Sequence, residues 1–396
     1  MIYEWRIHGE PVNVFTRLLL ICSVLFVIVL RQADAVADAS GTHTEPEPIT
    51  IGAIFSVTGI AAPHNRSLLE MIAVVAERVN ENGGVLGRPV EVLVFDNNST
   101  SIGALEAAHA ARDAGVTAVI GAHWSSHSLA IAPVLNEAGI PMISPASTHP
   151  GVTLNKDYVF RVSFTDVTQG RAMAHFAIES LKAKTSIVLS NIDEQYSATL
   201  AHYYSEAFQA AGGKVILDYG YRGAAADFTP LIETISRLDT DVIYIPGYSR
   251  DTALLMKQAR KHGVTATFLG GDGWDMLERL IPEDVEGSYQ TAQWHPDIPN
   301  RVSHFAQKLF DESTIDTITN YSTPLVYDAF MVLVKAIENA GSTDRKAIRD
   351  AIAATDNYLG ATGSISFDEH GDLRDTNVII MKYVHGKRVF NSTVSP

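Results

Sequence analysis

Residues 118–150 read AVIGAHWSSHSLAIAPVLNEAGIPMISPASTHP, and this stretch decides the fold that the sequence predicts. It contains two consecutive units of strand, loop and helix start. The apolar β-rich run 118–120 precedes a helical spacing of apolar residues over 125–138. The next expected strand, 140–143, leads into a loop at 144–148 that is rich in hydroxyl groups. Such repetition is typical of an open parallel sheet, where small ligands bind in the crevice at the carboxyl ends of the strands.

The two loops of this stretch are candidates for binding an anion. The hydroxyl groups of Ser125, Ser144 and Thr148 stand where helices are expected to begin. Helix N-termini present unpaired N–H groups and a partial positive charge, so a carboxylate is the natural guest. The alternative is that these hydroxyl groups only cap the helices, and this stretch alone leaves both interpretations open.

The N-terminal segment has the pattern of an export signal. Arg6 and Arg17 precede the apolar run 18–30, and residues 33–39 offer several A-x-A cleavage sites. The run is short for a membrane span, so the sequence predicts that residues 1–39 are a removed signal peptide. A retained transmembrane anchor is the alternative.

Composition narrows the class of the exported chain. Cys22 is the only cysteine and lies within the signal, so the mature chain would contain no disulfide and no cysteine-ligated metal. The net charge of -15 argues against nucleic acid or anionic membrane as a partner. Residues 40–48 are a polar linker with two prolines. The remainder is longer than one hydrophobic core usually supports, which indicates two lobes.

Strand and helix patterns alternate from residue 49 onward and restart after residue 162, which predicts an α/β fold with two Rossmann-like lobes and right-handed crossovers. The expected strands are 49–55, 90–95, 116–120, 140–143, 158–162, 186–190, 214–219, 241–245 and 267–269. The expected helices are 68–79, 104–114, 171–182, 198–211, 228–238, 252–262, 302–310, 323–340 and 343–354. A terminal hairpin is expected over 364–390, turning at 370–372.

No catalytic signature is present. The sequence lacks a dinucleotide-binding G-x-G-x-x-G, a P-loop, a G-x-S-x-G elbow and a zinc-binding H-E-x-x-H. His123 and His127 have a spacing that suits a metal on a helix, but no carboxylate accompanies them and His123 falls in a loop. The sequence therefore predicts no enzyme activity, no cofactor and no metal.

Three residues at expected strand ends of the second lobe complement the anion-binding loops of the first. They are Tyr196, Tyr248 and Asp272. A carboxylate opposite an anion site suits a zwitterion, with its ammonium on Asp272 and the tyrosines packed on what lies between. The alternatives are that Asp272 is an ordinary turn residue and that the tyrosines only pack at the lobe surface.

The order and spacing of many short motifs together resemble the leucine/isoleucine/valine-binding protein family. These proteins are the type I periplasmic substrate-binding components of branched-chain amino acid ABC transporters. The motifs span residues 49 to about 389, and no single one is specific. They lie at 51–53, 58–59, 82–89, 94–96, 120–121, 125–126, 143–148, 160–161, 227–228, 327–329 and 367–372.

The resemblance implies two α/β lobes joined by a three-strand hinge, with the ligand enclosed between them. Lobe 1 would comprise 49–166 and 294–372, and lobe 2 would comprise 167–293 and 373–396. The family's ligand contacts map onto Ser125, Ala146 and Thr148 for carboxylate and ammonium, Tyr196 and Tyr248 for closure, and Asp272 for the ammonium.

One departure affects the ligand's side chain. His64, in the loop after the first strand, stands where the family often has an aromatic residue, and Trp124 and Trp274 are expected to flank the site. The side-chain pocket can therefore differ, so leucine is not assumed.

The resemblance further implies a monomeric protein of the periplasm that delivers an amino acid to an ABC permease, without a cofactor or a nucleic-acid partner. A branched-chain or other hydrophobic amino acid is the expected ligand. A short amide, urea or an aromatic acid is an alternative ligand within the same fold. A sensor domain of a signalling receptor and an enzyme are alternatives from other classes.

Overall fold

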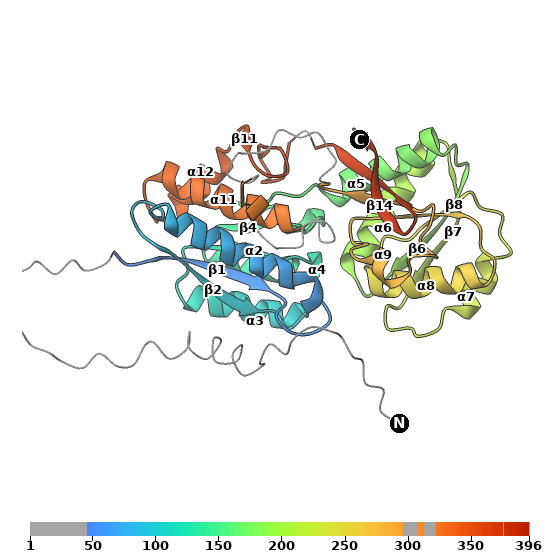
Figure 1. Cartoon of the computed structure of the whole chain (residues 1–396), viewed down its shortest axis with the longest axis horizontal. Coiled ribbons are helices and arrows are strands. Elements are labelled where there is room, and N and C mark those ends of the chain that lie inside the picture. The colour runs from blue at the N-terminus through green and yellow to red at the C-terminus, as the bar shows by residue number, and fades with distance from the viewer. Residues whose placement is uncertain (1–45, 296–307, 310, 313–321, 375, 396) are drawn as a thin grey trace, which may run out of the picture. The chain divides into compact units, whose positions relative to one another are not determined.

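The computed structural model describes residues 46–295, 308–309, 311–312, 322–374 and 376–395. Its strands form two large sheets, one in each lobe, and a separate two-stranded sheet (Figure 1). The α/β class with two lobes that the sequence predicts is therefore confirmed.

The sheet of lobe 1 has the order β2-β1-β3-β4-β5, and all its strands are parallel. The strands are β1 (Ile49–Phe55), β2 (Val90–Asp96), β3 (Ala118–Gly121), β4 (Met142–Ser144) and β5 (Val159–Arg161). The helices are α2 (Ala62–Glu81), α3 (Ser101–Asp113), α4 (Ser125–Glu137), α11 (Thr323–Ala340) and α12 (Arg345–Ala353), with a 3₁₀ turn, η1, at Pro150–Val152. Strands β11 (Tyr358–Leu359) and β12 (Ser364–Ile365) form the two-stranded sheet.

The sheet of lobe 2 has the order β14-β13-β10-β9-β8-β6-β7. Strand β13 pairs antiparallel with β10 and with β14, and the other pairs of this sheet are parallel. The strands are β6 (Thr185–Asn191), β7 (Lys214–Tyr221), β8 (Val242–Tyr244), β9 (Thr267–Gly270), β10 (Tyr289–Ala292), β13 (Val378–Val384) and β14 (Lys387–Val394). The helices are α5 (Asp166–His175) with its π-helical extension η2 (Phe176–Ser180), α6 (Gln195–Ala210), α7 (Thr229–Ile235), α8 (Ser249–Lys261) and α9 (Leu277–Leu280).

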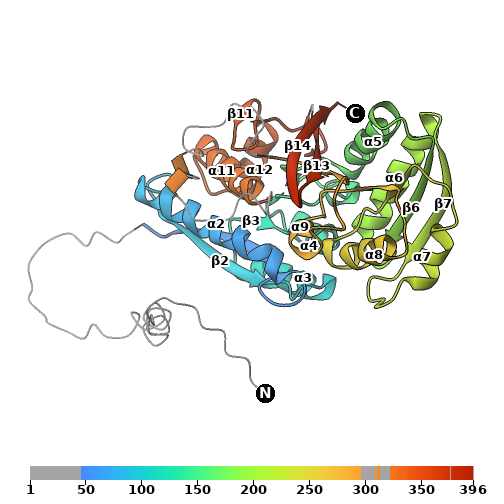
Figure 2. The same cartoon turned by 45° about the vertical axis from the view of Figure 1, so that its right-hand side comes forward.

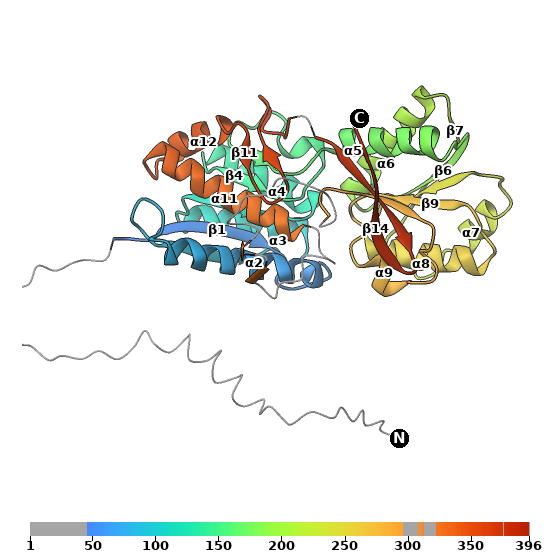
Figure 3. The ribbon, with the colours of Figure 1, turned by 45° about the horizontal axis from the view of Figure 1, so that its top comes forward.

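The core of lobe 1 joins segments that are far apart in the sequence. Helix α11 packs on α2, and both belong to one buried apolar cluster with β1 (Figures 2 and 3). Most side chains of α11 are buried, which matches its nearly continuous apolar sequence. Because α11 follows β10 in the chain, the polypeptide passes between the two sheets three times: after β5, after β10 and before β13.

The C-terminal hairpin differs from the one expected. The paired strands are β13 and β14, and they turn at His385 and Gly386, both with positive φ, as a two-residue hairpin turn requires. The expected turn at 370–372 is instead a local loop, in which the Asp368 carboxylate accepts the N–H groups of His370 and Asp372. Both segments carry turn-forming residues, and only the long apolar alternation on each side of the second distinguishes them.

Two expected segments fall on residues that the structure does not describe. The signal at residues 1–39, with its apolar run, and most of the expected helix 302–310 lie outside the described residues. Within the described part of the chain, no helix is both long and apolar enough to cross a membrane.

Candidate functional site

A small cavity of about 30 Å³, here called the inner cavity, lies where loops of both lobes meet. Seven of the residues expected from the sequence line it, whereas Ser144, His64 and Trp274 do not. The lining residues are His123, Trp124, Ser125, Ala146, Thr148, Tyr196, Tyr248, Asp272, Gly273, Asp275 and Ser322.

Ser125 brings the N-terminus of α4 to the inner cavity. It is the first residue of the helix, and its side chain does not cap it. Instead, the Ser125 hydroxyl accepts the N–H groups of Thr148 and His149, each at 3.3 Å. The start of η1 is capped by His149, not by Ser144 or Thr148. The simple capping interpretation therefore does not describe these hydroxyl groups, and α4 presents its first N–H groups without a side-chain cap.

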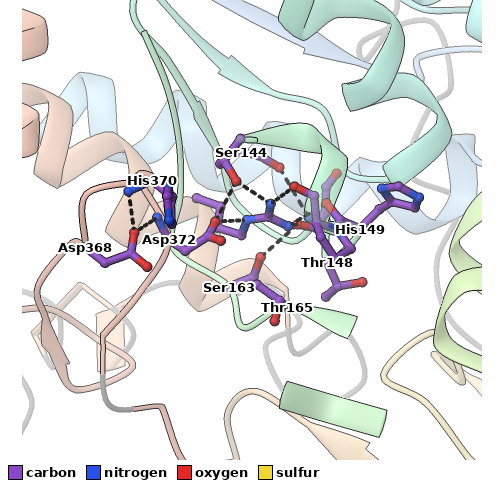
Figure 4. Close-up of polar contacts among 12 residues, drawn as sticks. Ser144, Thr148, His149, Ser163, Thr165, Asp368, His370 and Asp372 are labelled. Atoms are coloured by element: carbon purple, nitrogen blue, oxygen red, sulfur yellow. Dashed lines mark hydrogen bonds and ion pairs between the residues drawn. The ribbon is translucent and has the colours of Figure 1, made fainter. Parts of the chain in front are cut away.

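The loop that carries Ala146 and Thr148 is held by Arg161, whose side chain is completely buried. Its guanidinium donates to the carbonyl oxygens of Ser147 and His149, both at 2.9 Å, and to the Thr153 hydroxyl at 2.7 Å (Figure 4). Nε pairs with the Asp372 carboxylate at 2.6 Å. This buried cation thus ties the loop to Asp372, in the segment that leads to β13 in lobe 2.

Asp272 faces the cavity from the end of β9, and side chains of other elements hold its carboxylate. It accepts the Tyr196 hydroxyl from α6 at 2.9 Å and the amide of Gln293 at 2.8 Å. Its own N–H donates to the Gln169 side chain at 2.8 Å. Burial raises the pKa of Asp272, and these hydrogen bonds oppose the rise. An ordinary turn aspartate would bond its own turn, so this network favours a site residue.

Tyr196 can approach this loop because residue 271 is a glycine. A Cβ atom at Gly271 would collide with the Tyr196 hydroxyl, which also accepts the N–H of Gly273 at 3.0 Å. The expected strand-end position of Tyr196 needs refinement, because it lies in the first turn of α6. The helix start, not the strand end, therefore places its ring.

Asp166, the first residue of α5, lies beside the site and was not singled out by sequence reasoning. It is fully buried, and the Thr148 hydroxyl, which lines the inner cavity, acts on its carboxylate as a hydrogen-bond donor. Burial raises its pKa to about 8, with a further upward contribution from Asp272 and a downward one from the Thr148 hydroxyl. Asp166 therefore lies close to Thr148 of lobe 1 and to Asp272 of lobe 2. In the sequence it looks like an ordinary first-turn acid after the cap residue Thr165.

Four aromatic rings form a column that crosses from lobe 1 to lobe 2. The ring of Trp124 stacks on His127 with centroids 5.6 Å apart and on Tyr248 with centroids 4.1 Å apart. Tyr248 stacks in turn on Tyr196 at 5.1 Å. The Ser125 N–H lowers the raised pKa of Tyr248, so the Tyr248 hydroxyl faces the start of α4.

His64 lies in the first turn of α2 and not in the preceding loop as expected. It lines a second, outer cavity of about 280 Å³, together with Trp124 and Tyr248. Trp274 does not flank the inner cavity: it is completely buried in the core of lobe 2, and its indole N–H donates to the carbonyl oxygen of Ile245 at 2.9 Å. The apolar β9 segment beside it explains this placement.

His123 and His127 are held as neutral side chains. His123 contacts Asn65 at 3.3 Å and Ser322 at 3.2 Å, and His127 contacts Asn97 at 3.2 Å. Burial lowers the pKa of His123 to about 3 and that of His127 to about 4. Among the residues whose placement is described, no group of three or more potential ligands could hold a metal ion.

The family follows from a comparison of the whole chain with known proteins. A model of the periplasmic binding proteins matches residues 48–387, almost the entire folded part. The chain belongs to the periplasmic binding protein family. The resemblance inferred from its sequence motifs is thereby confirmed.

Relatives of this periplasmic binding protein include the leucine-, isoleucine-, valine-, threonine- and alanine-binding protein of Pseudomonas aeruginosa. The two are 28% identical over 362 residues, which cover 89% of this chain and 95% of the relative. The crystal structure of a leucine-binding protein from Thermotoga maritima has a TM-score of 0.82 and 36% identity, covering 88% and 99% of the two chains. A branched-chain amino acid transporter substrate-binding protein from Streptococcus pneumoniae, solved with isoleucine, has a TM-score of 0.81 and 25% identity over 88% and 100%.

Proposed function

We propose that this periplasmic binding protein captures an α-amino acid between its lobes and delivers it to an ABC permease. One observation carries the proposal: the partly buried carboxylate of Asp272 and the uncapped start of α4 at Ser125 line the same cavity from opposite lobes. A zwitterion complements both groups, because its carboxylate suits the helix start and its ammonium suits the aspartate.

Three residues that line the inner cavity have the main roles in this proposal. Ser125 and Thr148 hold the carboxylate of the amino acid through hydroxyl and N–H groups. Asp272 accepts the ammonium. Enclosing a carboxylate between the lobes without a cationic partner is unfavourable, so a cationic ligand group stabilises this arrangement.

Closure follows from the division of contacts between lobes. Ser125 belongs to lobe 1 and Asp272 to lobe 2, so one ligand can reach both only when the lobes are together. Ligand binding then shifts the population toward the closed state, by as much as the ligand's preference for that state. The proposed lobes are 49–166 with 294–372 and 167–293 with 373–396.

The named relatives support the setting. Their names assign them amino acids as ligands and, for the pneumococcal protein, a transporter as partner. We extend this to the present chain as an exported monomer whose signal at residues 1–39 directs it to the periplasm. The permease is proposed to recognise the closed form.

Thermal unfolding of the purified protein tests the proposal. Twenty amino acids, short amides, urea and aromatic acids are added one at a time. A ligand at a hundred times its Kd adds about 2.7 kcal/mol to the free energy of unfolding, which moves the Tm by several degrees. We expect one or a few amino acids to raise the Tm, and the Asp272→Ala variant to lose the response. Asp239→Ala, at an exposed carboxylate of the same lobe, is the matched control.

The other outcomes separate the alternatives. A response only to ligands without an ammonium would leave the family intact but contradict the role of Asp272. Recovery of a chemically altered ligand after incubation would favour an enzyme.

A further inference from the structure

The inner and outer cavities share two residues, Trp124 and Tyr248. The centroids of their rings lie 4.1 Å apart and their planes differ by 12°. At this separation the rings are in van der Waals contact, and no further atom fits between them. The pair is therefore a wall between the groups that suit an amino acid's zwitterionic end and the larger space beside His64.

Trp124 is fixed in this wall from its own lobe. The indole is only 7% exposed, and it also stacks on His127, with centroids 5.6 Å apart. His127 is itself buried and hydrogen-bonded to Asn97, so it does not readily move away. His64 contacts the indole from the outer cavity, with centroids 6.3 Å apart. Contacts with both rings restrict the movement of Trp124.

Tyr248 is fixed from lobe 2. Its ring stacks on Tyr196, and Tyr196 is anchored by Asp272 and by the N–H of Gly273. Both halves of the wall are thus positioned before the lobes meet. Closure brings the two rings together beside the ligand.

We propose that Trp124 limits the size of the ligand's side chain, so that this site selects small α-amino acids such as glycine, alanine, serine and threonine. This inference rests on the function proposed above. An inner cavity of about 30 Å³ holds one or two water molecules, less than even glycine needs, so every amino acid must displace lining groups. The displacement required grows with the size of the side chain, and Trp124 stacked on Tyr248 resists it on the side of the outer cavity. A leucine side chain must separate Trp124 from Tyr248, or keep the lobes from closing fully.

Removal of the indole joins the two cavities. The Trp124→Ala variant should therefore admit side chains into the outer cavity of about 280 Å³, which is lined partly by apolar groups of Ile60 and Ala224. The same variant loses a ring contact between the lobes, which weakens every ligand alike. This common loss cancels in the ratio of the Kd for leucine to the Kd for alanine. A change in the ratio therefore measures only how far Trp124 restricts the size of the side chain.

Calorimetric titration of the purified protein with glycine, alanine, threonine, valine and leucine provides the test. We expect the wild type to bind alanine more tightly than leucine, and Trp124→Ala to lower the leucine-to-alanine Kd ratio by roughly tenfold or more. Trp124→Leu, which retains part of the wall and of the packing, should give an intermediate ratio. Tyr219→Phe, at an exposed tyrosine of β7 that lines neither cavity, serves as the matched control, with an unchanged ratio.

Three results would overturn the inference while leaving the proposed function standing. They are tighter binding of leucine than alanine by the wild type, an unchanged ratio in both Trp124 variants, and an equal change in Tyr219→Phe. Absence of binding by every amino acid in the wild type would instead contradict the proposed function itself.

Discussion

The hydroxyl of Tyr196 donates to the carboxylate of Asp272 across 2.9 Å, and the same hydroxyl accepts the N–H of Gly273 at 3.0 Å. A residue of α6 thereby fixes the loop that follows β9. The orientation of Asp272 depends on this contact as well as on Gln293.

Replacement of Tyr196 by phenylalanine should weaken amino acid binding while preserving the fold. A hydrogen bond to a charged group contributes about 1.5–3 kcal/mol, so we expect the Kd to rise by roughly tenfold to a hundredfold. Calorimetric titration with the best amino acid measures the change. Tyr203→Phe, on the same helix and outside the inner cavity, should leave the Kd unaltered. An equal loss in both variants would contradict a specific role for the Tyr196 hydroxyl.

Asp166 should make stability depend on pH. Its carboxyl group has an ordinary pKa of 3.8, and burial raises this to about 8 in the folded chain. Between these values the folded state holds one proton more than the unfolded state, so the free energy of unfolding falls as pH rises. The contribution of Asp166 is fully present below pH 4 and is lost as pH approaches 8.

The difference between the wild type and Asp166→Asn isolates this effect from other titrating groups. Relative to the variant, the wild type should lose up to about 1.4 kcal/mol for each pH unit in this window, measured by urea unfolding without ligand. A difference that stays constant from pH 4 to pH 8 would show that Asp166 does not bind a proton in this range.

The buried pair of Arg161 and Asp372 should stabilise the protein far more than an exposed pair. Arg161→Ala leaves the Asp372 carboxylate and several carbonyl oxygens without their cation, and we expect a loss of about 3–5 kcal/mol in the free energy of unfolding. Arg66→Ala breaks the exposed pair with Glu70 and should change stability by about 0–1 kcal/mol. Urea unfolding compares the two, and similar small losses would contradict the importance of burial.

Asp328 should stabilise the contact between α11 and the loop that joins β11 to β12. Its carboxylate accepts the N–H groups of Ala361 at 2.6 Å and Thr362 at 2.9 Å, and the Thr362 hydroxyl at 2.6 Å. Asp328→Ala removes the acceptor of the buried Ala361 N–H, at a cost of about 1–3 kcal/mol where water does not replace the bond, and it also removes the two partly buried bonds from Thr362. We expect a lower Tm for Asp328→Ala and a smaller decrease for Asp328→Asn, which retains one acceptor oxygen. Equal Tm values for both variants and the wild type would contradict this role.

The sequence correctly predicted the helices and strands that are defined by residues close together in the chain. The alternating runs around Ser125 and Ala146 define strands β3 and β4 with helix α4, because apolar periodicity and glycine stops act over a few residues. His64 was assigned to a loop because the apolar spacing of α2 becomes clear only at Leu68. Pro63 is in fact tolerated in the first turn of that helix.

The contacts that complete the candidate site are not local. Asp166 has no distinguishing sequence pattern, since its importance lies in its complete burial near Thr148 and Asp272, which are distant in the sequence. Trp124 and Tyr248 belong to different lobes, so no periodicity relates them. Trp274 was wrongly expected to flank the site, because its packing in the core of lobe 2 depends on residues distant in the sequence.

The packing of α11 on β1 and α2 also determines when the protein can fold during its synthesis. A nascent chain that ends after β5 carries the complete sheet of lobe 1, but it exposes the apolar surface that α11 later covers. The sheet of lobe 2 likewise awaits β13 and β14, near the end of the chain. Independent domains can fold one after another as they leave the ribosome. In this chain neither lobe can do so, because each is completed by residues that the ribosome adds near the end of translation.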